Sequence, residues 1–165
     1  MSTQKHPAAI AANERDPYEY KYGNFPRSPV DGKLVAILRP SRLDRALQLI
    51  PEKSRCIRAG EVHELILTDQ LDAAPDSCVD RVAYLAFVEF AKGGVIVQGD
   101  VLTIDGQTIG DLIGYDETHM PNHLNIVIGG ENFSSGYDRG LILGGRFSFA
   151  TRFADYRNIS GDELP

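Results

Sequence analysis

The sequence predicts a mainly β protein, a small β-barrel with one short helix and an extended N-terminal arm. Short apolar runs recur along the chain, and glycine pairs or an Asp-Gly step separate them. Many short strands with glycine turns are typical of barrels and sandwiches. The 165 residues, of which 42% are hydrophobic, fit one domain with a core of its own.

Residues 1–31 are expected to form the arm, because they are rich in proline and show no hydrophobic period. Within them Tyr18, Tyr20 and Tyr22 alternate, so an extended chain would place the three rings on one face. The arm packs on a neighbouring subunit or on its own barrel, or it forms a short edge strand. We predict the first, a homodimer or larger homo-oligomer, with residues 32–165 as a single β-barrel domain.

The first strand is expected at residues 33–38, where Pro40 follows it. Ser41-Arg42-Leu43-Asp44 resembles a capping box, and apolar side chains at 43, 46, 47 and 50 follow helical spacing. This pattern predicts a helix over 41–50. The period then changes to two and predicts strands at 61–68, 82–90, 95–97, 101–104, 108–114, 124–128 and 141–149. Asp105-Gly106 predicts a type I′ hairpin between two of them.

Composition excludes several classes of partner. A formal net charge of −6 argues against nucleic acid and against an anionic membrane surface. No apolar run approaches the roughly 20 residues of a membrane span, and no signal peptide is visible, so a cytoplasmic location is expected. Cys56 and Cys78 lack any zinc-ligand spacing and are expected to be small buried side chains.

The polar segment from Asp116 to Asn125 is the densest candidate for chemistry, because it holds two of the four histidines. Imidazole titrates near neutrality and suits proton transfer, and a carboxylate can fix its tautomer. We therefore predict a site for a small-molecule ligand. Its candidate catalytic residues are His119, His123, Asp116 and Glu117, and its candidate substrate-binding residues are Asn122, Asn125, Glu89 and His63. The alternative is a plain connector whose polar side chains cap their own backbone.

A metal site at His119 and His123 is an open alternative, although we predict no metal and no cofactor. Pro121 lies between the two histidines and disfavours a helix, and an extended chain would hold them about 13 Å apart. They could share an ion only if Pro121-Asn122 turned the loop back. A third ligand would then be needed, from His63, Glu61, Glu64, Glu89 or Asp116.

Glu89 stands inside the otherwise apolar run of residues 82–90. A carboxylate on the inner face of a barrel is costly to bury unless it is paired. Glu89 is therefore either solvated or an interior group with a raised pKa that suits general-base chemistry.

Four short motifs resemble the glucitol/sorbitol-specific IIA component of the bacterial sugar phosphotransferase system. They are Ala74-Pro75 before the strand at 82–90, Lys92-Gly93-Gly94 followed by Gly99, the run from Asn122 to Gly130, and Gly145 to Phe149. The resemblance covers about half of the chain and implies a β-barrel. The first 50 or so residues lie outside it.

The sequence departs from that family at its active site. The family's phosphorylated histidine lies in a His-x-His-Gly-Glu-Leu run, and this chain reads Phe87-Val88-Glu89-Phe90-Ala91 there. The resemblance therefore implies the fold but not phosphoryl transfer. The sequence favours an enzyme with His/carboxylate acid–base chemistry, of isomerase, lyase or cyclase type. The alternative is a non-catalytic ligand-binding or interaction domain with a transport-system-like fold.

Overall fold

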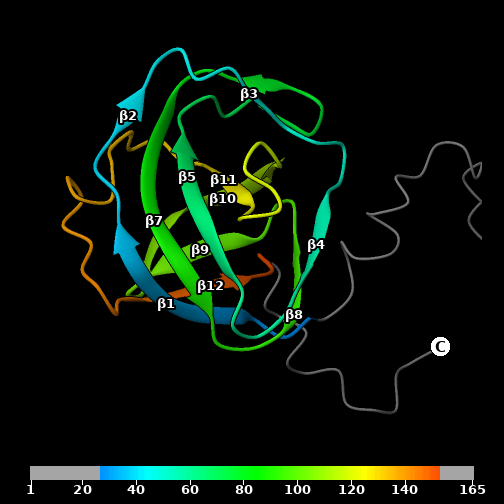
Figure 1. Cartoon of the computed structure of the whole chain (residues 1–165), viewed down its shortest axis with the longest axis vertical. Coiled ribbons are helices and arrows are strands. Elements are labelled where there is room, and N and C mark those ends of the chain that lie inside the picture. Colours follow the sequence, from blue (N-terminus) through cyan, green and yellow to red (C-terminus); the bar gives the residue numbers. More distant parts are fainter. Residues whose placement is uncertain (1–26, 153–165) are drawn as a thin grey trace, which may run out of the picture.

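The computed structural model describes residues 27–152, which form β-strands and contain no helix (Figure 1). The mainly β prediction is confirmed. The predicted arm lies outside the described residues up to position 26, with its tyrosines, whereas its last residues are described and Val30 and Asp31 are in the first strand. The strands are β1 (Val30–Ile37), β2 (Ser41–Arg42), β3 (Leu47–Gln48), β4 (Ser54–Ile57), β5 (Val62–Thr68), β6 (Cys78–Val79), β7 (Val82–Phe90), β8 (Gly94–Val97), β9 (Val101–Ile104), β10 (Gln107–Asp116), β11 (Asn125–Gly129) and β12 (Arg146–Ala150).

One large mixed sheet organises the molecule. Its strand order is β1-β12-β9-β10-β11-β5-β7-β2, and β1 also pairs with β7, so hydrogen-bonded neighbours run in a ring from β1 back to β1 (Figure 1). The β11–β5 pair is parallel, and the other pairs of this sheet are antiparallel. Two small sheets, β3-β6 and β4-β8, lie beside it.

Most of the predicted strands are present. The strands predicted at 82–90 and 101–104 have those bounds, and β9 joins β10 through the predicted two-residue turn. Asp105 and Gly106 in that turn both have positive φ, 48° and 79°, as a type I′ turn requires. The strand predicted at 141–149 is shorter, because residues 141–145 turn and only Arg146–Ala150 pairs.

The predicted helix over 41–50 is wrong. Ser41 pairs with Ala83 of β7, Leu47 pairs with Val79 of β6, and Ala46 between them has a φ of 50° that no right-handed helix contains. Leu47 and Leu49, two residues apart, are both buried. Strand pairing and the burial of these two side chains outweigh the local helical pattern.

Two apolar clusters hold the sheet together. The larger one fills the interior of the ring and contains the stacked and edge-on rings of Phe90, Phe147 and Phe149. The smaller one joins Leu47, Leu49 and Val79 of the β3-β6 sheet region to side chains on the other face of the large sheet, which are Ile66, Val82, Ile113 and Val127. The segment 43–50 therefore covers part of the outer face of the ring.

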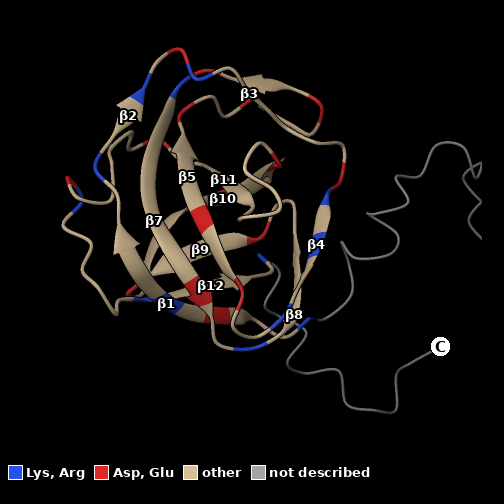
Figure 2. Cartoon of the chain, in the orientation of Figure 1, with Lys and Arg blue, Asp and Glu red and all other residues tan. Residues whose placement is uncertain are grey.

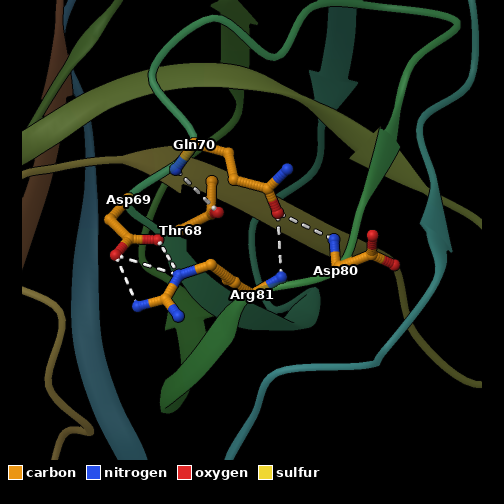
Figure 3. Close-up of polar contacts among 5 residues, drawn as sticks. All are labelled: Thr68, Asp69, Gln70, Asp80 and Arg81. Atoms are coloured by element: carbon orange, nitrogen blue, oxygen red, sulfur yellow. Dashed lines mark hydrogen bonds and ion pairs between the residues drawn. The ribbon is translucent and has the colours of Figure 1, made fainter.

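The loop between β5 and β7 is closed by polar contacts (Figure 3). The Arg81 Nε and Nη2 atoms donate to the Asp69 carboxylate at 2.8 Å each. Gln70 Oε1 accepts the backbone N–H groups of Asp80 and Arg81, again at 2.8 Å. These bonds join the end of β5 to the start of β7.

Both cysteines are exposed, so the expectation that they are buried is wrong. Each precedes a buried apolar residue in a strand, Ile57 after Cys56 and Val79 after Cys78. Because side chains alternate along a strand, burial of the second residue turns the thiol outward.

Candidate functional site

A row of polar side chains crosses the outer face of the sheet. Asp116 of β10 stands opposite Asn125 of β11, Asn125 opposite Glu64 of β5, and Glu64 opposite Phe87 of β7. Directly opposed residues share a face, so three neighbouring strands bring a carboxylate, an amide and a second carboxylate side by side. Glu64 shares this face with Ile66. Figure 2 shows an acidic position in red within the otherwise tan β5.

The loop after β10 turns back toward this row. Met120 N–H donates to the Glu117 carbonyl at 3.0 Å, and Asn122 N–H donates to the His119 carbonyl at 2.9 Å. The Met120–Pro121 peptide bond is cis. The loop thus makes the reversal that a shared site for His119 and His123 requires.

Glu64, His119 and His123 come together above the row. One ligand atom from each lies within 4.8 Å of the other two. His123 Nε2 is 3.5 Å from Glu64 Oε2, and the two imidazole rings stack with their centroids 4.9 Å apart. The Phe87 ring meets His123 edge-on at 4.9 Å. Glu64 is buried, His123 half-buried and His119 exposed, so the cluster opens to solvent on the His119 side.

The hydrogen bonds of His123 define its tautomer. Its Nδ1 atom lies 2.6 Å from Asn122 Oδ1, and because an amide oxygen only accepts, Nδ1 carries the proton. Nε2 is then unprotonated and carries a lone pair, and it is buried without a hydrogen-bond partner. Asn125 Oδ1 is also buried and unpartnered, while its Nδ2 donates to Asp116 Oδ1 at 2.8 Å.

His63 has a different role from the other two histidines. Its Nδ1 accepts the backbone N–H of Leu124 at 3.1 Å, so Nε2 carries the proton and donates to Glu61 Oε2 at 3.0 Å. Its ring packs edge-on against Phe90 of the core. Both ring nitrogens are therefore used, and His63 anchors the end of the loop instead of joining the cluster.

Burial sets the electrostatics of the cluster. Desolvation raises the pKa of Glu64 to about 7, with Arg45 acting against the rise and Asp116 adding to it. Desolvation lowers the pKa of His123, the neighbouring His119 and His63 lower it further, and the Asn125 side chain acts against the fall. Both shifts favour the neutral forms of the two side chains.

The remaining predicted residues lie around the cluster or away from it. Asp116 accepts hydrogen bonds from Thr118 Oγ1 at 2.8 Å and from Asn125, so it orients the amide and not a histidine. Glu117 is exposed and outside the cluster. Glu89 is on β7, between β1 and β5, and pairs with Lys33 at 3.2 Å with 39% of its side chain exposed. Of the two environments considered for Glu89, solvated or interior, the structure shows the solvated one.

Glu64 was considered from the sequence only as a possible third metal ligand, and it is the residue that completes the site. A signal was present, since strict alternation through β5 puts it on the same face as the apolar Ile66. What the sequence lacked was the parallel register that sets Glu64 beside Asn125.

The arrangement combines a buried carboxyl group, an imidazole nitrogen with a free lone pair and a second, solvent-facing imidazole. Such a set can take and give protons, or it can ligate a cation. Two surface cavities of about 260 and 400 Å³ lie elsewhere in the described part and contain none of these residues. Their linings share Arg146, and the smaller one includes Glu89.

Among residues 27–152 no helix is long and apolar enough to cross a membrane. No curated protein and no solved structure matches the chain. A family model matches residues 24–150, which is well over half of the sequence. The chain therefore belongs to DUF6917, a family of unknown function.

Proposed function

We propose that the chain is a small-molecule enzyme whose reacting centre is the cluster of Glu64, His119 and His123. The chemistry is proton transfer, of isomerase, lyase or cyclase type. The observation that carries the proposal is the buried Nε2 of His123, which has no hydrogen-bond partner and lies 3.5 Å from the Glu64 carboxyl group. An unsatisfied buried polar atom costs roughly 1–3 kcal/mol, and a catalytic role or a bound ion is one reason for a protein to retain it.

The surrounding residues supply orientation. Asn122 holds the His123 ring through Nδ1, and Asp116 holds the Asn125 amide through Nδ2. The free Oδ1 of Asn125 can then accept a hydrogen bond from a substrate hydroxyl or amine. The exposed His119 lines the open side by which a small molecule would enter.

Proton transfer can be tested before the natural substrate is known. The full chain is incubated in D₂O with a panel of small 2-oxo and 2-hydroxy acids, ketones and aldoses, and loss of C–H signals is followed by proton NMR. We expect accelerated exchange for at least one compound and a loss of about 100-fold or more in His123→Gln. Glu131→Gln, an exposed carboxylate in another loop, is the control that keeps the rate. Exchange no faster than without protein for every compound contradicts the proposal.

The proposal extends to architecture and context. We propose that the ring of strands is a closed β-barrel of the kind found in the glucitol/sorbitol IIA family, which the β1–β7 pairing supports. Phe87 and Glu89 stand in place of that family's histidines, so phosphoryl transfer by that route is not part of the function. On the sequence arguments above, the enzyme is placed in the cytoplasm as a homo-oligomer.

A further inference from the structure

We propose that Glu64, His119 and His123 together bind one divalent transition-metal ion. The inference deepens the proposed function and rests on it only in placing the reaction at this cluster. It replaces our prediction of no metal, because the loop makes the reversal on which that alternative depended.

The three residues are a ligand set that transition metals favour. Two imidazoles and one carboxylate hold catalytic zinc and non-haem iron sites in other proteins. Ligand atoms around a tetrahedral zinc lie about 3.4 Å apart, given bonds of roughly 2.1 Å. His123 Nε2 and Glu64 Oε2 are already 3.5 Å apart, and His119 offers an atom within 4.8 Å of both. His119 is exposed and on a loop, so a small rotation of its side chain completes the set.

The hydrogen bonds around the cluster prepare it for a cation. A metal-bound histidine usually donates its other ring N–H to an oxygen acceptor, which fixes the tautomer and the ring plane. His123 does this through Nδ1 and Asn122 Oδ1, and the buried Nε2 is left free toward Glu64. An ion would give this nitrogen the partner that it lacks. His63 is excluded as a ligand because both of its ring nitrogens are already hydrogen-bonded.

Three protein ligands leave a coordination position open, as in catalytic and not in structural sites. The unpartnered Oδ1 of Asn125 is buried beside the cluster, in the row next to Glu64. It could accept a hydrogen bond from a water or substrate hydroxyl on the ion. In that state Glu64 and His123 serve as ligands, and the ion's water is the group that exchanges protons.

The test is titration of the full chain with Zn²⁺ and with Co²⁺ after removal of metal by a chelator. Both exposed thiols compete for soft ions, so the background carries Cys56→Ser and Cys78→Ser. We expect one ion per chain by calorimetry, a rise in melting temperature on binding, and a visible Co²⁺ spectrum without thiolate bands. Glu64→Gln, His119→Gln and His123→Gln should each weaken binding by about 100-fold or more. Asn122→Ala should weaken it by about 10- to 100-fold, as expected for a residue that orients a ligand.

Glu131→Gln is the matched control and should bind as the background does. Binding that is absent, or that all three ligand substitutions leave unchanged, overturns the inference. Circular dichroism of each metal-free variant separates loss of ligand from loss of fold. If no ion binds and the D₂O exchange persists in metal-free protein, the metal inference fails and the proposed function stands. If the ion binds at these residues and no compound exchanges, the metal inference stands and the proposed function fails.

Discussion

At the scale of single residues, hydrogen-bond partners decide what each histidine can do. His63 and His123 are both near Glu64, yet one uses both ring nitrogens and the other leaves a buried lone pair free. The sequence marked His119, His123 and Asn122 as candidates in one polar loop, and it left open whether the two histidines meet. It could not predict which nitrogen of His63 is protonated, because the Leu124 backbone, 61 residues away in the chain, reaches His63 only through the tertiary fold.

The residue-scale prediction concerns the pKa of Asp69. Hydrogen bonds from Arg81 lower the pKa of Asp69, and burial raises it by a smaller amount (Figure 3). Folding therefore favours the carboxylate. A lowered pKa contributes stability above the unfolded value, and that contribution is lost as pH falls through the folded value. Asp69→Asn should therefore lower the free energy of unfolding at pH 7 by a small amount that shrinks below pH ~4.

Urea unfolding of wild type and variant at pH 7 and at pH 3 measures this difference. The other groups around Asp69 are Arg81, which also lies over the Phe133 ring, and Asp80, whose backbone binds Gln70. Asp44→Asn is the control, because its side chain is 83% exposed and its partner Arg42 is a looser contact at 3.3 Å. An Asp69→Asn deficit of equal size at both pH values would show that the carboxylate charge is not its cause.

At the scale of elements, the segment from Ser41 to Ile50 shows where local pattern fails. Its spacing is that of an amphipathic helix, but Leu47 and Leu49 cover the outer face of the sheet as extended chain. Leu38 before it and Ile50 at its end are fixed by backbone bonds to Leu85 and Tyr115. Such long-range bonds leave no trace in a ten-residue window. In contrast, β7 was predictable from its nearly continuous apolar and aromatic run, and β9 from its alternation.

The covering role of this segment predicts which of its leucines matter. Leu47→Ala should destabilise the protein by about 2–5 kcal/mol, since Leu47 is fully buried in the smaller cluster. Leu43→Ala should cost less than about 0.5 kcal/mol, because Leu43 is 63% exposed. A helix over 41–50 would instead predict similar costs at both positions, because both belong to its apolar face. Urea denaturation of the two variants separates these outcomes.

At the scale of the whole molecule, the sequence predicted the class and most of the strands but not their neighbours. The β1–β7 and parallel β5–β11 pairs join segments far apart in the chain, and neither follows from turn chemistry. The pairing of β1 with both β7 and β12 also restricts which residue can stand at position 32. A Cβ on Gly32 would collide with the Glu89 carbonyl and the Phe147 ring, where β1 lies between β7 and β12.

The prediction for the whole molecule concerns its assembly into oligomers. We expect residues 14–26, with their alternating tyrosines, to dock on a partner subunit, so removing them should lower the oligomeric state. The shortened chain should begin at Arg27, because Arg27 holds the buried Asp100 through two bonds of 2.7 and 2.8 Å. Light scattering of both chains measures the mass. Equal masses would exclude the arm as the interface.

The parallel pairing of β5 with β11 has a kinetic consequence. More than fifty residues separate the two strands, so their contact must await closure of a long loop, which is slow in folding proteins. Glu64 is on one of these strands, and His123 lies two residues before the start of the other. In a refolding experiment, binding competence should therefore appear with the last slow phase and not with early collapse, which makes the cluster a chemical reporter of native topology.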